Sequence, residues 1–204
     1  MIYASCVGLF QQSLVANMGS FDLDLPAETI SRLGEYYSLL TRWNDRLHLV
    51  APCTPEEFAV RHVLESLMLL KHLPQNATIA DIGSGGGLPI IPCLIVRPDL
   101  EATLIESSQK KSVFLREATR GLKATIIAQP FEQIDPPPVE FVTCRALDQF
   151  MQKLPALIDW APEGSTLLLF GGETLREELR KASVNFEALL IPQSEKRFLF
   201  LATD

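Results

Sequence analysis

The residues best suited to hold a ligand form a glycine-rich loop. Asp81-Ile82-Gly83-Ser84-Gly85-Gly86-Gly87 follows the pattern D-x-G-x-G-x-G after an apolar run that is typical of a strand. Glycine permits a sharp turn and lets a ligand approach the backbone without interference from a Cβ atom. A dinucleotide-binding loop would have its third glycine at position 88, where this chain has Leu88, and no G-K-[ST] follows to cradle phosphate. The spacing therefore favours S-adenosyl-L-methionine as the cofactor.

A carboxylate closes the next predicted strand. Glu106 follows Leu104-Ile105 and stands 23 residues after Gly83. In doubly wound α/β folds, an acid at this place hydrogen-bonds the ribose hydroxyls of a nucleoside cofactor. We therefore expect Gly83, Gly85 and Glu106 to bind the cofactor. The alternative is a loop that is glycine-rich for turning alone, with Glu106 solvated at a strand end.

Alternating helices and strands must position this loop. From residue 78 onward, short runs of Ile, Leu, Val and Thr alternate with helical stretches. The first five runs are separated by segments long enough for crossover helices, which parallel pairing requires, whereas about six residues separate the last two, which suits a hairpin. We predict a mostly parallel, doubly wound, seven-stranded sheet with an antiparallel C-terminal hairpin, its strands near 78–82, 101–106, 124–128, 139–144, 165–170, 186–191 and 197–202.

The beginning of the chain is predicted to be helical. Apolar residues recur every three or four positions over residues 30–47, and Pro26 is placed to start this helix. Thr54-Pro55-Glu56-Glu57 is a T-x-x-E capping box with proline at the first helical position, which begins a second helix. We expect residues 1–75 to form a helical cap that packs as one unit with the α/β domain of residues 76–204.

Composition limits the class of protein. The chain has 204 residues and a mass of 22.7 kDa, with 47% hydrophobic and 21% charged residues, which is typical of one globular domain and excludes a disordered chain or a disulfide scaffold. Four widely spaced cysteines and three histidines without ligand spacing predict a reducing compartment and no metal site. Arg32 is the first basic residue, and no apolar run could span a bilayer, so we expect a cytoplasmic protein without membrane contact.

Charge restricts any nucleic-acid contact to a local surface. Lys and Arg total 18 against 25 Asp and Glu, and this net charge of −7 repels polyanions. Residues 107–123 nevertheless carry a local charge of +4, from Lys110, Lys111, Arg116, Arg120 and Lys123 against Glu117. We expect this helix face to grip phosphate, with a second contact on the long N-terminal helix at Arg32, Arg42 and Arg46. The alternative is an ordinary solvated helix face.

The stretch that begins with the glycine loop identifies more than a fold. Residues 81–98, DIGSGGGLPIIPCLIVRP, resemble the glucose-inhibited division protein B family, bacterial methyltransferases that modify a guanine N7 of small-subunit (16S) ribosomal RNA. Further matches are Trp43-Asn44, Arg61-His62, Glu65-Ser66 and Phe114-Leu115-Arg116. The resemblance implies a class I methyltransferase-like fold for the α/β domain and S-adenosyl-L-methionine as cofactor. It also implies a partner, small-subunit ribosomal RNA within a ribonucleoprotein particle.

The resemblance implies roles for individual residues. The family's cofactor contacts fall on Gly83, Leu88, the Phe131-Glu132 pair and Arg145. Phe131-Glu132 would form the adenine site; the alternative is a core Phe beside a surface Glu. Guanine N7 already carries a lone pair, so we expect catalysis by positioning rather than by a general base. Arg145 would be the catalytic residue that orders the cofactor end and the opening through which the substrate enters. The alternative role of Arg145 is a surface ion pair.

Three positions depart from the family pattern and keep other functions open. Pro130 and Phe170 stand where the family usually has an arginine and a lysine, and His48 replaces an asparagine. A diverged member that binds the cofactor but methylates another substrate, or is non-catalytic, is therefore the alternative. A dinucleotide oxidoreductase is a third possibility, which Leu88 opposes. Cys144, at a strand end, would suit covalent attack on cytosine C5, but a cysteine there is more often a small hydrophobe.

Overall fold

One seven-stranded sheet forms the centre of the molecule in the computed structural model, which describes residues 2–145 and 150–203. Its strand order is β3-β2-β1-β4-β5-β7-β6. The first five strands pair in parallel, and β7 runs antiparallel to both β5 and β6. The prediction of a mostly parallel sheet with a C-terminal hairpin is confirmed. The strands are β1 (Thr78–Ile82), β2 (Glu101–Ile105), β3 (Ala124–Ile127), β4 (Phe141–Arg145), β5 (Thr166–Gly171), β6 (Asn185–Leu190) and β7 (Phe198–Thr203).

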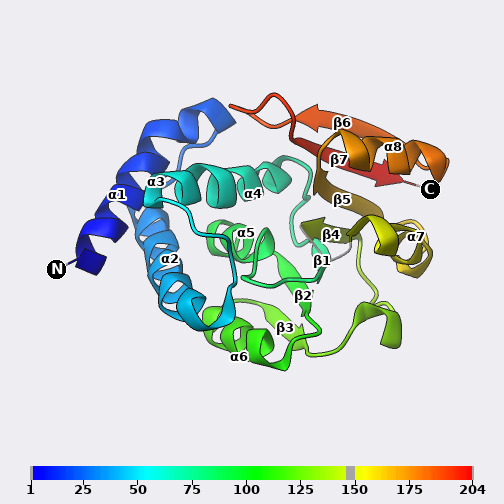
Figure 1. The fold of residues 1–204 in the computed structure, drawn as a ribbon, viewed down its shortest axis with the longest axis horizontal. Helices are drawn as coiled ribbons and strands as arrows, with labels where there is room; N and C mark the ends of the chain where they lie inside the picture. Colours follow the sequence, from blue (N-terminus) through cyan, green and yellow to red (C-terminus); the bar gives the residue numbers. More distant parts are fainter. Residues whose placement is uncertain (1, 146–149, 204) are drawn as a thin grey trace.

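Helices cover both faces of the sheet (Figure 1). Successive side chains of a strand point to opposite faces, so β1 contributes to two cores. Ile79 packs with residues of α5 and α6 in one core, whereas Ala80 and Ile82 pack with residues of α7 and α8 in the other. The connecting helices are α5 (Ile90–Val96), α6 (Gln109–Ala118), η4 (Phe131–Gln133), α7 (Phe150–Trp160) and α8 (Glu173–Lys181).

Most of the first 75 residues are helical, as predicted. The predicted capping box is present, because the Thr54 hydroxyl accepts the Glu57 N–H at 3.1 Å. The helix that it begins contains a π-helical turn, which the apolar periodicity did not predict. A π turn carries one extra residue and recurs at functional sites. The helices are α1 (Ile2–Asn17), η1 (Met18–Phe21), α2 (Ala27–Leu47), α3 (Pro55–Glu57), the π turn η2 (Phe58–Leu64), α4 (Glu65–Leu67) and η3 (Met68–Lys71).

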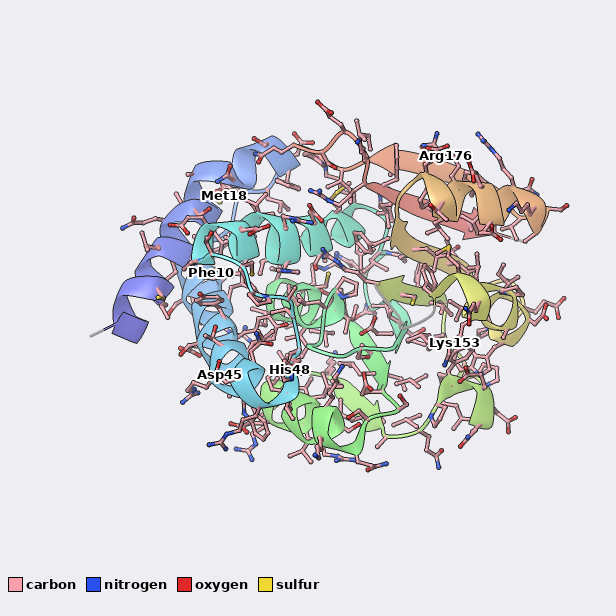
Figure 2. The ribbon with its side chains drawn as sticks, viewed as in Figure 1. Phe10, Met18, Asp45, His48, Lys153 and Arg176 are labelled. Atoms are coloured by element: carbon pink, nitrogen blue, oxygen red, sulfur yellow. The ribbon has the colours of Figure 1, made fainter. Side chains whose placement is uncertain are left out.

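Aromatic side chains hold the N-terminal helices together. The rings of Phe10 and Tyr37 stack with centroids 4.6 Å apart, and Phe58 tilts against both. Figure 2 shows Phe10 on α1 beside α2. From the neighbouring position on α2, the buried Tyr36 hydroxyl donates to the Gly86 carbonyl at 2.6 Å. The N-terminal helices therefore contact the glycine loop directly, while the predicted division between residues 75 and 76 stays a prediction.

Three structural findings bear on the expectations drawn from composition. Cys93 and Cys144 are buried, which suits small hydrophobic side chains. Within the part of the chain that the structure describes, no cluster of His, Cys, Asp and Glu side chains is arranged to hold a metal ion. No helix among those residues is long and apolar enough to cross a membrane.

Candidate active site

The glycine loop leaves β1 at its carboxyl end and turns through left-handed backbone. Gly83, Gly85 and Gly87 have φ angles of 69°, 53° and 80°, a region that residues with a Cβ atom rarely adopt. A Cβ on Gly87 would lie 2.2 Å from Cδ1 of Ile91. These glycines are therefore required by the backbone itself, in agreement with the predicted sharp turn.

Glu106 joins the glycine loop to the end of β2. Its side chain is buried, and its carboxylate accepts the N–H groups of Gly85 at 2.9 Å and Ser108 at 2.8 Å. Glu106 is thus held in place rather than solvated. A carboxylate has about four lone-pair positions, so each oxygen can still accept a hydrogen bond from a ligand hydroxyl.

A cavity of about 590 Å³ opens beside these groups. Binding sites for drug-sized ligands span roughly 300–1,000 Å³, so this cavity has room for a nucleoside cofactor. Five predicted site residues line it together, namely Gly83, Gly85, Leu88, Glu106 and Arg145. The remaining lining residues are Leu49, Val50, Ala51, His62, Ser84, Gly86, Ser107, Ser108 and Lys111.

The loop after α2 supplies one wall of this cavity, and Asn44 fixes it. The Asn44 amide donates to the Val50 carbonyl at 3.1 Å, and its oxygen accepts the Val50 N–H at 2.9 Å. His48 ends α2 with a φ of 49°, a left-handed conformation that asparagine adopts more readily than most residues. Position 48, where His replaces the family's asparagine, is therefore a left-handed turn next to the cavity wall.

Arg145 extends from the end of β4 to the N-terminal helices. Its guanidinium donates to the Arg61 carbonyl, to Ser66 Oγ at 3.2 Å and to Glu65 Oε2 at 3.2 Å. It also lies over the Phe170 ring, 5.3 Å from the centroid. The Arg145 side chain is only 16% exposed and that of Glu65 only 1%, so this ion pair is buried rather than superficial.

Glu65 is shared between two arginines that sequence spacing did not connect. Arg197, immediately before β7, donates to Glu65 Oε1 through Nη2 at 2.6 Å and through Nε at 3.1 Å. The sequence marks Glu65 only as part of the family match Glu65-Ser66, and it gives no signal for Arg197. Because 132 residues separate the two partners, no local pattern could have paired them.

His62 lies on the π turn and lines the cavity as a neutral group. Burial, followed by the positive charges of Arg145 and Arg61, lowers the pKa of His62 to about 4. Its ring packs against Phe58, with centroids 5.0 Å apart. The Arg61-His62 match therefore places a carbonyl that binds Arg145 beside an uncharged imidazole.

The Phe131-Glu132 pair lies in a neighbouring narrow cleft. This cleft shares Gly83 and Ser107 with the larger cavity, and Pro130 also lines it. Phe131 is 3% exposed and packs edge-on against Trp160, with centroids 5.7 Å apart. Glu132 pairs with Lys153 at 2.9 Å, and Figure 2 shows Lys153 on α7 near η4. The structure thus brings the pair beside the glycine loop, and its contact with adenine stays a prediction.

Asp81 is a further acidic group at this end of the sheet. It is fully buried, and neither carboxylate oxygen has a hydrogen-bond partner among the described residues. Burial raises the pKa of Asp81 well above its usual range. S-adenosyl-L-methionine combines ribose hydroxyls, a positive sulfonium and an apolar methionine chain. Among the residues that line the cavity, the Glu106 carboxylate suits the ribose hydroxyls and Leu88 suits the apolar methionine chain, so the residues present fit this cofactor, whereas Asp81 does not line the cavity.

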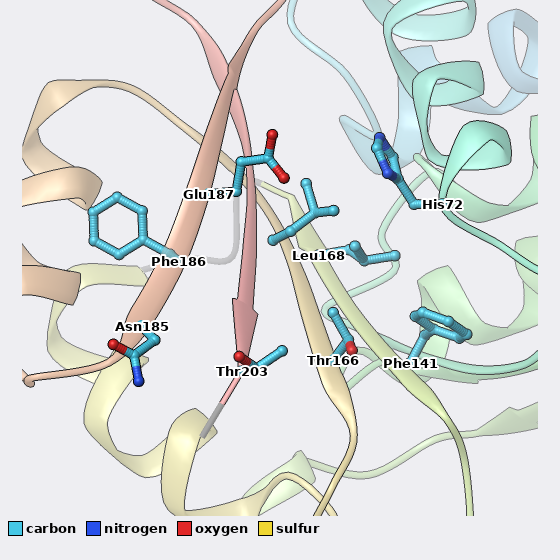
Figure 3. Close-up of a pocket in the computed structure, with 9 residues that line it drawn as sticks. His72, Phe141, Thr166, Leu168, Asn185, Phe186, Glu187 and Thr203 are labelled. Carbon is cyan, nitrogen blue, oxygen red and sulfur yellow. The ribbon is translucent and has the colours of Figure 1, made fainter.

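A second hollow of about 610 Å³ lies away from these residues, over the β4-β5-β7-β6 part of the sheet. Figure 3 shows Glu187 and His72 on its upper rim and Thr166 and Thr203 lower down. None of the predicted site residues lines it. The predicted residues gather instead at the carboxyl ends of the parallel strands, where open α/β sheets bind ligands.

Comparison with known proteins decides the family. Residues 29–201 match the family GidB, described as rRNA small subunit methyltransferase G. The chain belongs to this family. Ribosomal RNA small subunit methyltransferase G of Gluconobacter oxydans is 39% identical over 165 residues, covering 78% of this chain and 83% of that protein. Its namesake in Methylobacillus flagellatus is 33% identical over 200 residues, covering 94% and 97%.

Solved structures support the fold. A SAM-dependent methyltransferase from Aquifex aeolicus superposes with a TM-score of 0.60 at 13% identity, covering 82% of this chain and 98% of that one. Family and fold together confirm the recognised resemblance, the class I methyltransferase-like architecture and the enzyme class. They also confirm S-adenosyl-L-methionine as the cofactor and oppose a dinucleotide oxidoreductase. The roles of the individual site residues stay predictions.

Proposed function

We propose that this protein transfers a methyl group from S-adenosyl-L-methionine to N7 of a guanine in small-subunit (16S) ribosomal RNA, within a ribonucleoprotein particle in the cytoplasm. One observation carries the proposal. A member of the GidB family brings its glycine loop, Glu106 and Arg145 together around one cavity of cofactor size. The relatives named above act on ribosomal RNA of the small subunit, as their names state.

Different residues of the cavity bind different parts of the cofactor. Gly83 and Gly85 present backbone without side chains, and the Glu106 carboxylate accepts hydrogen bonds from ribose hydroxyls. Leu88 packs on an apolar part of the cofactor, and the Phe131-Glu132 pair contacts the edge of the adenine from the adjoining cleft, whose volume of about 20 Å³ is too small for the ring itself. The bound cofactor supplies an electrophilic methyl group on a positively charged sulfur.

The reaction needs alignment more than proton transfer. The N7 lone pair of guanine forms the new N–CH3 bond, the S–CH3 bond breaks, and its electron pair stays on sulfur. No proton leaves the base, which agrees with a cavity whose one histidine, His62, is neutral and has its pKa lowered to about 4. Proximity and orientation of this kind can contribute roughly 7–11 kcal/mol to lowering a barrier. We assign Arg145, which lines the cavity, as the catalytic residue that orders the cofactor end and the entrance for the substrate.

Replacing Arg145 tests this role. Arg145→Ala should abolish turnover in a single-turnover assay, and Arg145→Lys should restore little, because lysine cannot reproduce the three donor contacts of a guanidinium. Arg176→Ala is the matched control, since Arg176 also lies over a phenylalanine, 4.3 Å from the Phe198 centroid, but outside the cavity. Full activity of Arg145→Ala would remove Arg145 from the mechanism.

A basic surface next to the cavity is suited to the RNA backbone. Arg32 and Arg42 of α2 and Arg120 after α6 line one hollow of about 340 Å³ between the two helices, together with the acids Glu35 and Glu117, so three basic and two acidic side chains give it a net charge of +1. Lys110 is exposed on α6, and Lys111 lines the cofactor cavity itself. The two predicted basic patches thus adjoin each other and extend to the cavity, which supports phosphate contact on this side.

Charge reversal tests that surface without touching the cavity. Lys110→Glu combined with Arg120→Glu should weaken binding to small-subunit RNA and lower the slope of log K against log [salt] by roughly 0.7–0.9 for each phosphate that the variant no longer neutralises. Arg180→Glu with Lys181→Glu on α8 makes the same charge change elsewhere and serves as the control. Equal affinity and salt slope in both double variants would mean that RNA binds another surface.

The proposed function is tested by transfer of tritiated methyl groups. Small-subunit particles and naked ribosomal RNA, both lacking the modification, are incubated with the protein and labelled S-adenosyl-L-methionine, and the labelled base is mapped. Label at a guanine N7 is the expected result. Calorimetric binding of the cofactor without label in either substrate would instead favour a diverged member that methylates another substrate or is non-catalytic.

A further inference from the structure

A smaller pocket of about 260 Å³ lies next to the cofactor cavity and shares Arg145 with it. It is below the roughly 300–1,000 Å³ of sites that take drug-sized ligands, so it suits a single planar base rather than a whole cofactor. Phe150 at the start of α7 and Phe170 at the end of β5 line it, together with Gly171, Gly172, Arg145 and Arg197.

The pocket combines aromatic faces with hydrogen-bond donors. Aromatic side chains stack on nucleic-acid bases that have left their own stack, and arginine guanidinium planes do the same. Arg145 already lies over the Phe170 ring, so Phe170 is held in place from one side. Phe170 is 7% exposed, while Phe150 is half-buried and can adjust to a base.

The donors in this pocket exceed the acceptors. Both carboxylate oxygens of Glu65, the acid that lines the pocket, are engaged by Arg145 and Arg197. Arg197 binds Glu65 through Nε and Nη2, and its side chain is 36% exposed, so Nη1 is available to a ligand acceptor. Guanine presents the acceptor O6 beside N7, whereas adenine presents the donor N6 in the same place. Since the Glu65 oxygens are occupied and Arg197 Nη1 is a donor, the pocket favours guanine.

We propose that this pocket receives the acceptor guanine of the RNA, turned out of its stack, with Phe170 and Phe150 as its aromatic contacts and Arg197 as a donor to O6. The inference rests on the proposed function and adds the place and the recognition of the base. Methyl transfer requires N7 to accept no hydrogen bond, so the proposal has Arg197 donate to O6 alone. Phe170, which departs from the family's usual lysine, is in this chain a base-stacking residue, while Arg197 distinguishes guanine from adenine.

Three substitutions test the pocket. Phe170→Leu and Phe150→Leu keep apolar bulk but remove the aromatic face, whereas Phe170→Tyr keeps it. Each leucine variant loses one aromatic contact with the base, which should raise KM for small-subunit RNA by roughly ten- to a hundredfold. The Kd for S-adenosyl-L-methionine, measured by calorimetry, should be unchanged and shows that each variant is folded. Phe186→Leu is the control, because Phe186 lies on β6 at the far hollow (Figure 3).

A direct binding measurement separates failure of the pocket from failure of the proposed function. Guanosine and adenosine monophosphates are titrated into the protein saturated with S-adenosyl-L-homocysteine. The pocket is supported if the wild-type protein prefers the guanosine form and both Phe170→Leu and Phe150→Leu weaken that binding. This holds even if the wild-type protein methylates no ribosomal RNA, because absence of methylation would overturn the proposed function alone. Wild-type methylation with unchanged KM in both leucine variants overturns the pocket alone. Absence of both methylation and nucleotide binding overturns both.

Discussion

His62 predicts a pH dependence of stability that can be traced to one side chain. Burial, with the charges of Arg145 and Arg61, lowers its pKa in the folded protein from 6.5 to about 4. Between these two values the unfolded chain binds a proton at position 62 and the folded chain does not. The neutral His62 therefore contributes stability that is fully present above pH 6.5 and is lost as the pH falls from 6.5 toward 4.

The size of the effect follows from the two pKa values of His62. A pKa difference of one unit corresponds to about 1.4 kcal/mol, so the complete loss below pH 4 is about 3 kcal/mol. At pH 5 the unfolded state is almost fully protonated and the folded state is mostly neutral, which gives a loss of about 2 kcal/mol relative to neutral pH. A typical domain has a free energy of unfolding of about 5–15 kcal/mol, so this difference is measurable.

Urea denaturation at about pH 7.5 and about pH 5 gives the comparison. The wild-type protein should lose about 2 kcal/mol more free energy of unfolding than His62→Gln over this interval. Taking the difference between the two proteins cancels the other titrating groups, including Asp81, whose raised pKa acts in the opposite direction. His48→Asn replaces an exposed histidine and serves as the control. Equal pH dependence of the wild-type protein and His62→Gln would refute the argument.

Three further substitutions test the packing around the site. Gly87→Ala should lower the free energy of unfolding by about 1–3 kcal/mol, because alanine must adopt a φ of 80° against Ile91; an unchanged urea midpoint would contradict this. Tyr36→Phe removes the hydroxyl that donates to Gly86 and should cost about 0.5–1.5 kcal/mol in urea denaturation, so a more stable variant would speak against that bond. Glu65→Gln leaves two arginines without their carboxylate and should lower the thermal midpoint by about 6–20 °C, corresponding to about 3–5 kcal/mol; a wild-type melting curve would show that the buried pair contributes nothing.

Much of the fold and the glycine loop could be predicted because their signals are local. The alternation of apolar runs and helical stretches, with crossover lengths between the first five strands, determines a mostly parallel sheet and its final hairpin. The D-x-G-x-G-x-G spacing determines where the chain must take left-handed turns, and the acid at 106 follows from the length of one βαβ unit. Each of these depends on residues within about 25 positions of one another.

The remaining features depend on contacts between distant segments. The π turn around Arg61 and His62 breaks the helical period locally, but only its contact with Arg145, 84 residues away, gives it a role. The two basic patches become one surface because α2 packs beside α6. Glu65 acquires two arginine partners only when α4, β4 and β7 meet. A buried carboxylate needs such partners, and no spacing along the chain could indicate which residues the fold would bring to it.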